Sequence, residues 1–214
     1  MSAEPGEHDA TDITIASYQD AAAVYLERSR RPSAALTGYL DEFARLTRGG
    51  PVLELGSGPG WDAEYLAGLG IHVTLSDATP AFVERLRAAG HDALTLDVRS
   101  DPLGGPYRGI LADAVLLHLD RIDFARALRA CRAAVEPTGT LGITLKEGDG
   151  SGWSTTKIDQ PRFFTYWQID DVRAELEAAG WTDIVIERIA GSRETWLFVI
   201  ARASGPATGG TMGT

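Results

Sequence analysis

Short apolar runs alternate with helical patterns through the middle of the chain. Val52–Leu55 is an apolar run with a β-branched start, which is typical of a buried strand. Trp61–Leu69 has helical character, and Gly70 supplies the stop. Six further strands are expected, at Ile71–Ser76, Ala93–Leu96, 107–111, Thr140–Lys146, Ile184–Ile189 and Glu194–Ala201. Helices alternate with the early strands, which predicts a parallel sheet.

Two helical patterns precede the first strand. Tyr18, Ala22 and Tyr25 share one helical face, and a second helix starts near Pro32 with its apolar positions between Leu36 and Leu46. Three helices are expected later in the chain, from Thr79 to Gly90, from Arg121 to Val135 and from Asp170 to Ala179.

The last two strands are separated by only a few residues that include Gly191. That length permits a hairpin and excludes a helical crossover. The expected fold is therefore α/β: a mostly parallel seven-stranded sheet with an antiparallel last strand, helices on both faces and extra N-terminal helices.

The chain has 214 residues, which predicts one domain, expected at residues 13–202. Residues 1–12 and 203–214 are polar or rich in Gly, Thr and Ala, and we expect both ends to be disordered. No apolar run approaches the roughly 20 residues of a membrane span, and the N-terminus lacks a signal-peptide pattern. The expected location is the cytoplasm, with no membrane partner.

Charge and cysteine usage remove several function classes. A net charge of −10 weighs against a nucleic-acid partner, because phosphate binding needs clustered Lys and Arg. Cys131 is the only cysteine, so an intramolecular disulfide and a cysteine-rich metal site are impossible. His72 and His91 lack ligand spacing, and no metal site is expected.

The first expected strand ends in a glycine-rich loop, Gly56-Ser57-Gly58-Pro59-Gly60. A strand, a glycine loop and a helix form the crevice where α/β sheets bind nucleotides. The third glycine comes one place too early for a dinucleotide fingerprint, and no Gly-Lys-Ser/Thr ending marks a phosphate loop. Glu54 inside the strand would repel a pyrophosphate and suits a ligand with positive charge or hydrogen-bond donors.

Acids also stand at the ends of the next two strands. Asp77 follows Gly56 by 21 residues, a spacing that suits hydrogen bonds from both ribose hydroxyls in NAD enzymes and others. Asp97 ends the third strand and is followed by Val98. Glu54, Asp77 and Asp97 are therefore expected to line one crevice.

The run Glu54-Leu-Gly-Ser-Gly-Pro-Gly60 resembles the first motif of class I S-adenosylmethionine (SAM)-dependent methyltransferases, which have a Rossmann-like sheet. The resemblance covers about residues 15–202 and implies SAM as cofactor. It implies that Glu54 and the loop hold the methionine part, Asp77 the ribose and Asp97 with Val98 the adenine. The cofactor-binding residues that it implies are Tyr18, Glu54, Gly56, Ser57, Gly58, Gly60, Asp77, Ala78, Asp97, Val98 and Leu111.

The acceptor side is less defined. The ending Leu-Leu-His118-Leu is similar to that of many small-molecule methyltransferases, although Arg108 stands where the family usually has an acid. His118 is either the general base or a packing histidine.

The segment 146–167 resembles a stretch that borders the acceptor pocket in bacterial methyltransferases. Trp153, Phe164 and Tyr166 are its expected substrate-binding residues; the alternative is a strand-like segment over 163–167 that packs on the core. Glu147 and Asp149 are alternative acid/base residues. Tyr18 and Tyr25 either cover the methionine end of the cofactor or pack between helices.

The predicted function is methyl transfer from SAM to an oxygen or nitrogen nucleophile of a small molecule, with secondary metabolism as the expected setting. A peptide or protein acceptor and a non-catalytic SAM-binding module are alternatives. An NAD(P)-dependent oxidoreductase is disfavoured by the glycine spacing and by Glu54.

Overall fold

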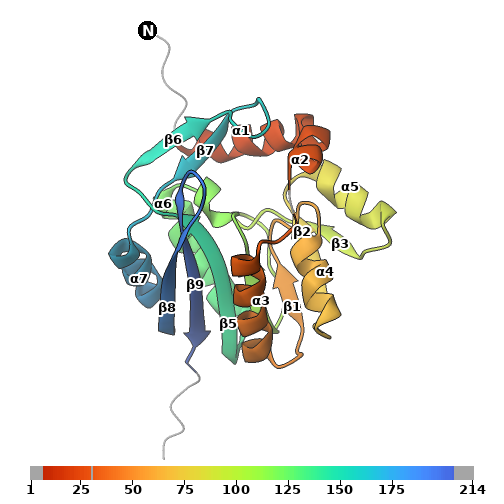
Figure 1. The fold of residues 1–214 in the computed structure, drawn as a ribbon. Coiled ribbons are helices and arrows are strands. Elements are labelled where there is room, and N and C mark those ends of the chain that lie inside the picture. The colour runs from red at the N-terminus through yellow and green to blue at the C-terminus, as the bar shows by residue number, and fades with distance from the viewer. Residues whose placement is uncertain (1–6, 30, 205–214) are drawn as a thin grey trace, which may run out of the picture.

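A central seven-stranded sheet organises the part of the chain that the structure, a computed structural model, describes: residues 7–29 and 31–204. The strand order is β3-β2-β1-β4-β5-β9-β8 (Figure 1). The strands are β1 (Val52–Glu54), β2 (Val73–Asp77), β3 (Ala93–Thr95), β4 (Tyr107–Ala112), β5 (Val135–Lys146), β8 (Trp181–Ala190) and β9 (Thr195–Ala203). β1 to β5 pair in parallel, whereas β9 is antiparallel to β5 and β8, which confirms the expected fold.

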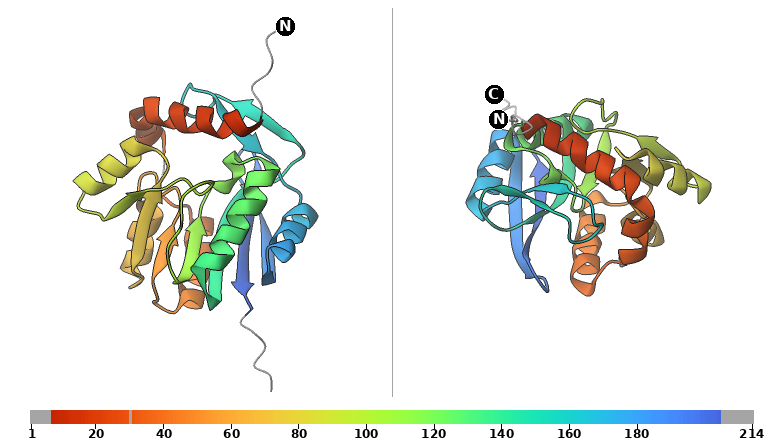
Figure 2. Two further views of the ribbon diagram at one scale, coloured as in Figure 1. Left: turned by 180° about the vertical axis from the view of Figure 1, so that it is seen from behind. Right: turned by 90° about the horizontal axis from the view of Figure 1, so that it is seen from above.

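Helices cover both faces of this sheet, as Figures 1 and 2 show from opposite sides. They are α1 (Glu7–Asp20), α2 (Ala22–Arg28), α3 (Ala34–Thr47), α4 (Trp61–Gly68), α5 (Pro80–Ala88), α6 (Arg121–Ala134) and α7 (Ile169–Ala178), with the short helix η1 (Leu116–His118). The buried residues of α3 pack with Val52 of β1, whereas those of α6 and α7 pack with Leu53. This is the side-chain alternation of a strand buried on both faces.

A second, two-stranded sheet joins β6 (Ser151–Ser154) to β7 (Arg162–Thr165). It lies beside α1 above the carboxyl edge of the parallel strands (Figures 1 and 2). The Phe163 amide donates to Thr14 Oγ1 at 2.9 Å, and Thr11 Oγ1 donates to the His118 carbonyl at 3.0 Å. These bonds fix α1 as a cover over that edge.

Several boundaries differ from the sequence expectations. α1 begins at Glu7, inside the segment 1–12 expected to be disordered, because its buried threonines bond to η1 and β7. β5 begins at Val135 rather than at the expected Thr140, and a register shift against β4 lies between its pairings of Val135 with Tyr107 and of Thr140 with Gly109. The expected disorder of 1–6 and 205–214 lies outside the described residues.

Within the described ranges, no helix has the length and apolar character needed to cross a membrane.

Candidate active site

The glycine loop leaves β1 with backbone angles that favour glycine. Gly56, Gly58 and Gly60 have φ of 63°, 47° and 82°. A Cβ on Gly56 would lie 2.4 Å from Val115 Cγ2, so this glycine permits close packing against the β4 side of the crevice. A Cβ on Gly58 would lie in ordinary van der Waals contact with Tyr25 Cε1, at 3.7 Å, so a methyl group there would not clash with the protein.

Asp77 joins this loop to the end of β2. Its Oδ2 accepts from the Gly58 amide at 2.9 Å, and its Oδ1 accepts from the Thr79 amide at 2.8 Å. Burial raises the Asp77 pKa, and the two amide bonds oppose that shift. Each carboxylate oxygen has a second lone pair, so Asp77 can still accept from a ligand.

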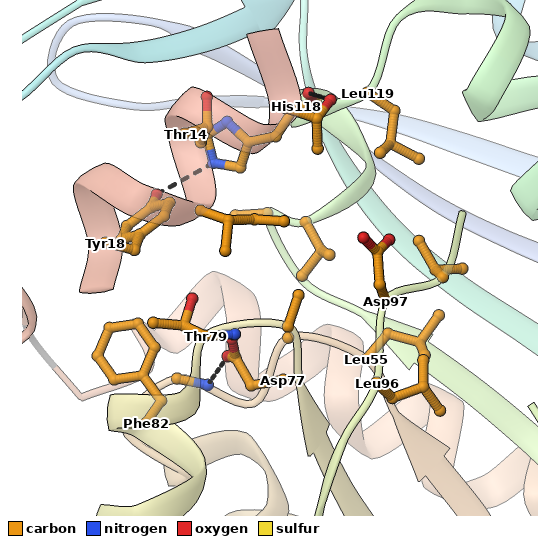
Figure 3. A pocket seen from close by; sticks show the side chains of 18 of the residues that line it. Thr14, Tyr18, Leu55, Asp77, Thr79, Phe82, Leu96, Asp97, His118 and Leu119 are labelled. Atoms are coloured by element: carbon orange, nitrogen blue, oxygen red, sulfur yellow. Dashed lines mark hydrogen bonds between the residues drawn. The ribbon is translucent and has the colours of Figure 1, made fainter. Parts of the chain in front are cut away.

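A cavity opens over this carboxyl edge, and Figure 3 shows its lining. Tyr18 and His118 approach it from α1 and η1, whereas Asp77 lies on the opposite side. The cavity also takes in Gly56, Gly58 and the third strand end at Asp97. Other lining residues are Thr11, Thr14, Ile15, Tyr25, Leu55, Ala78, Thr79, Phe82, Leu96, Val98, Asp113, Ala114, Val115 and Leu119.

Three acids cluster below the loop. Glu54 is 3% exposed and its Oε2 has no hydrogen-bond partner among the described residues. Its pKa is raised well above the usual range, first by burial and then by the charge of Asp62. Asp62 and Asp113 share a hydrogen bond, and burial together with Asp113 raises the Asp62 pKa to about 8. The Asp113 pKa is also raised by burial. With the Asp62 pKa near 8, the hydrogen-bonded Asp62–Asp113 pair shares one proton at neutral pH.

Asp97 is tied to an arginine that the sequence analysis did not single out. The Arg99 guanidinium bonds both Asp97 oxygens at 2.6 to 3.1 Å and reaches Asp12 of α1 at 2.6 Å. Burial raises the Asp97 pKa, but the Arg99 bonds outweigh it and the net shift is downward. Asp97 is thus an ionised acceptor whose oxygens a ligand must share with Arg99.

His118 is held at both ring nitrogens. Nδ1 lies 2.6 Å from the Phe163 carbonyl, which can only accept, so Nδ1 carries the proton. Nε2 therefore accepts from the Tyr18 hydroxyl at 3.0 Å. Arg162 Nη1 donates to the same hydroxyl oxygen at 3.2 Å. Burial lowers the His118 pKa to about 3, so the ring is neutral at physiological pH.

A second cavity of about 340 Å³ lies on the other side of this group. It shares Tyr18, Tyr25, Ala114 and His118 with the first cavity. Its remaining lining residues are Leu117, Lys146, Ser154, Thr156, Lys157, Arg162, Phe164, Ser192, Arg193, Glu194 and Trp196. Two adjoining chambers with four common residues suit two ligands that react with each other.

The structure brings most of the expected cofactor residues together. Tyr18, Gly56, Gly58, Asp77, Ala78, Asp97 and Val98 line the first cavity. Ser57 lines a neighbouring hollow with Asp62, Asp113 and Arg31. Glu54 is buried beneath the loop, and Gly60 caps α4 with its Cα facing Leu86. Leu111 is buried between α3 and the sheet, away from both cavities.

Of the residues expected to bind the acceptor, one lines the second cavity and two lie outside both cavities. Phe164, 2% exposed, lines the second cavity, and the strand-like segment is found at β7. Trp153 is 47% exposed on β6, and Tyr166 packs over Gly148; neither lines either chamber. The alternative acid Glu147 pairs with Arg188, and Asp149 accepts from Gln168.

Sequence reasoning did not select Asp113 or Asp62. Asp113 directly follows β4, so the argument used for Asp77 and Asp97, an acid at a strand end, could have found it. Arg162 and Lys157 lie in the β6–β7 segment, and no sequence pattern indicated that this segment folds back over the parallel strands.

The parallel sheet, its antiparallel β9 and the glycine loop are the features of the class I methyltransferase fold. Residues 27–185 match the model of a family described as a methyltransferase domain. The chain belongs to this family, as the sequence predicts.

A curated relative matches part of the chain in sequence. A ubiquinone biosynthesis O-methyltransferase from Methylocella silvestris is 37% identical over 107 residues, which are 44% of this chain and 41% of that enzyme. The chain therefore matches less than half the length of this relative.

Solved structures share the fold over nearly the whole chain. The 1,6-didemethyltoxoflavin-N1-methyltransferase of Burkholderia thailandensis, solved with 1,6-didemethyltoxoflavin and S-adenosylhomocysteine, has a TM-score of 0.69 at 22% identity and covers 95% of this chain and 92% of its own. Magnesium protoporphyrin IX methyltransferase from Synechocystis PCC 6803, solved with SAM, has a TM-score of 0.70 at 14% identity. The match covers 95% of this chain and 100% of that enzyme's chain.

Proposed function

We propose that this protein transfers the methyl group of SAM to an oxygen or nitrogen nucleophile of a small molecule. One observation carries the proposal: the chamber of the glycine loop and Asp77 adjoins a second chamber through Tyr18, Tyr25, Ala114 and His118. A donor in the first chamber and an acceptor in the second would meet at this shared wall.

The residues of the first chamber fit SAM. Gly58 lines this chamber, where the absence of a side chain lets a ligand approach its backbone closely, and Asp77 beside it retains acceptor capacity for ribose hydroxyls. The unpartnered Glu54 Oε2 and the Asp62–Asp113 pair supply acidic oxygens near the loop, where an ammonium group would be stabilised. Ala78, Asp97 and Val98 line the remaining end and would hold the adenine.

When bound, SAM supplies the activated methyl group, so the protein mainly has to orient the acceptor and exclude water. α1 and the β6–β7 hairpin cover the carboxyl edge and provide that enclosure. An acceptor chamber of about 340 Å³ with these covers favours a small molecule over a protein chain.

A base role for His118 stays a prediction, and its surroundings disfavour it. A ring whose pKa lies near 3 is a weak proton acceptor at neutral pH. We assign His118 instead to positioning: its Nε2 accepts from Tyr18 and so directs the Tyr18 oxygen toward Arg162.

The similarity to enzymes named for methylation at oxygen and at nitrogen supports both nucleophile types. The test is methyl transfer from labelled SAM to small molecules that carry hydroxyl or amine groups, with formation of S-adenosylhomocysteine as the readout. Acceptor-dependent product is expected, and its loss in Gly58→Ala would tie turnover to the glycine loop. Acceptor-dependent product that Gly58→Ala forms at the wild-type rate would contradict this assignment of the site.

A further inference from the structure

The acceptor chamber is a positively charged region in a chain whose net charge is −10. Four cationic side chains line it: Lys146, Lys157, Arg162 and Arg193. Glu194 is the single carboxylate among its lining residues. The local balance is therefore opposite to that of the molecule.

Arg162 is the most informative of these cations. It is 7% exposed, and within residues 7–29 and 31–204 no carboxylate lies within ion-pair distance of it. Its Nη1 donates to Tyr18, whereas its buried Nε has no described partner. A buried guanidinium without a counter-ion is costly, and a bound anion would remove that cost.

Two lysines add to the same field. Lys146 is 8% exposed, lies 3.8 Å from the Phe164 ring centroid and pairs with Glu194 at 2.8 Å. Lys157 lies over the Tyr25 ring at 4.0 Å. Burial and the charge of Arg162 lower the Lys157 pKa to about 8, which indicates a site where positive charges repel each other.

The carboxylate of the cofactor does not account for these cations. Arg162 and Lys146 line only the acceptor chamber and not the hollows around the glycine loop, whereas Lys157 lines both regions. An anion held by Arg162 therefore belongs to the molecule on the acceptor side of the Tyr18–His118 pair.

We propose that the methyl acceptor is an anionic small molecule whose carboxylate is held by Arg162, with Lys146 and Lys157 beside it. A carboxylate offers two oxygens that match the edge of a guanidinium group. This inference rests on the proposed function, because it assumes that the second chamber holds the acceptor.

The test uses two probes of nearly equal shape and different charge, benzoate and benzamide. Each is titrated calorimetrically into the full chain saturated with S-adenosylhomocysteine. Benzoate should bind at least about ten-fold more tightly than benzamide, the scale of one charge-assisted hydrogen bond in a buried site. Benzamide binding as tightly as benzoate would overturn the proposal.

Variants locate the effect. Arg162→Gln keeps a donor for Tyr18 and should reduce the benzoate preference about ten-fold while S-adenosylhomocysteine still binds. The matched control is Arg121→Gln, an arginine that stacks on Trp167 at 4.4 Å outside both chambers, and it should keep the preference. A preference that survives in Arg162→Gln would refute the assignment.

Lys146→Met provides the second variant if Arg162→Gln does not fold, and it should also weaken benzoate binding. Failure of the proposed function would look different, because the wild-type chain would then form no acceptor-dependent S-adenosylhomocysteine from labelled SAM, whatever its preference between benzoate and benzamide.

Discussion

The half-buried acids Asp62 and Asp113 should make cofactor binding sensitive to protons. Asp62 lies on α4 and shares a hydrogen bond with Asp113 at the end of β4. With the Asp62 pKa near 8, the pair holds one proton at neutral pH. Placing the ammonium group of SAM beside these oxygens would favour the ionised form, so binding should release that proton.

The size of the release follows from the pKa. A group with a pKa of about 8 is about 90% protonated at pH 7, so release should approach about 0.9 proton per SAM bound. In Asp62→Asn the amide can keep the hydrogen bond to Asp113 but cannot lose the proton. The release should therefore fall close to zero in that variant.

Calorimetric titration of SAM in two buffers of different ionisation enthalpy measures the number of protons released. Glu64→Gln is the control, because Glu64 is an exposed acid on the same helix that pairs with Arg31. It should release as many protons as the wild type. Equal release by Asp62→Asn, or none by the wild type at pH 7, would refute this reasoning.

Three further predictions concern the same edge of the sheet. Gly58→Ala should fold, because its Cβ would meet nothing closer than 3.7 Å, but it should bind S-adenosylhomocysteine at least about ten-fold more weakly in a titration. Gly56→Ala should lower the melting temperature more than Gly58→Ala does, because its Cβ would lie 2.4 Å from Val115 Cγ2. A larger drop in melting temperature for Gly58→Ala would contradict this reasoning. Asp77→Asn should weaken the binding of S-adenosylhomocysteine about 10- to 100-fold, the scale of lost charge-assisted hydrogen bonds. An unchanged dissociation constant in the folded variant would refute the assignment of Asp77 to the ribose. Because the His118 pKa falls from 6.5 to about 3 on folding, protons bind the unfolded chain more strongly, and stability is lost as pH drops below 6.5. Between pH 7 and pH 5, the free energy of unfolding in urea should fall by about 2 kcal/mol more for the wild type than for His118→Gln. An equal fall in both proteins would contradict a lowered His118 pKa.

The central sheet could be predicted from the sequence because its signals are local. Val52, Leu53 and Leu55 form a short, mainly apolar run before a glycine loop, and the closely spaced strands at 181–190 and 195–203 require a hairpin. Acids at the carboxyl ends of parallel strands must meet at one edge, so Asp77 and Asp97 were placed in one crevice without knowledge of side-chain positions.

The acceptor side could not be predicted in the same way. Arg162 meets Tyr18 across 144 positions in the chain, and this contact depends on how β7 folds back beside α1. Trp153 was expected in the pocket on its aromatic character, but period-two alternation in β6 leaves its side chain largely exposed. The type of a side chain does not by itself determine whether it lies on the inward or the outward face of a hairpin.

Binding of S-adenosylhomocysteine compared with NADH tests the central claim most directly. Isothermal titration of the wild-type chain should show saturable binding of one S-adenosylhomocysteine per chain and no heat with NADH, because Glu54 and the spacing of the loop glycines disfavour a pyrophosphate. Heat with NADH and none with S-adenosylhomocysteine would contradict the account.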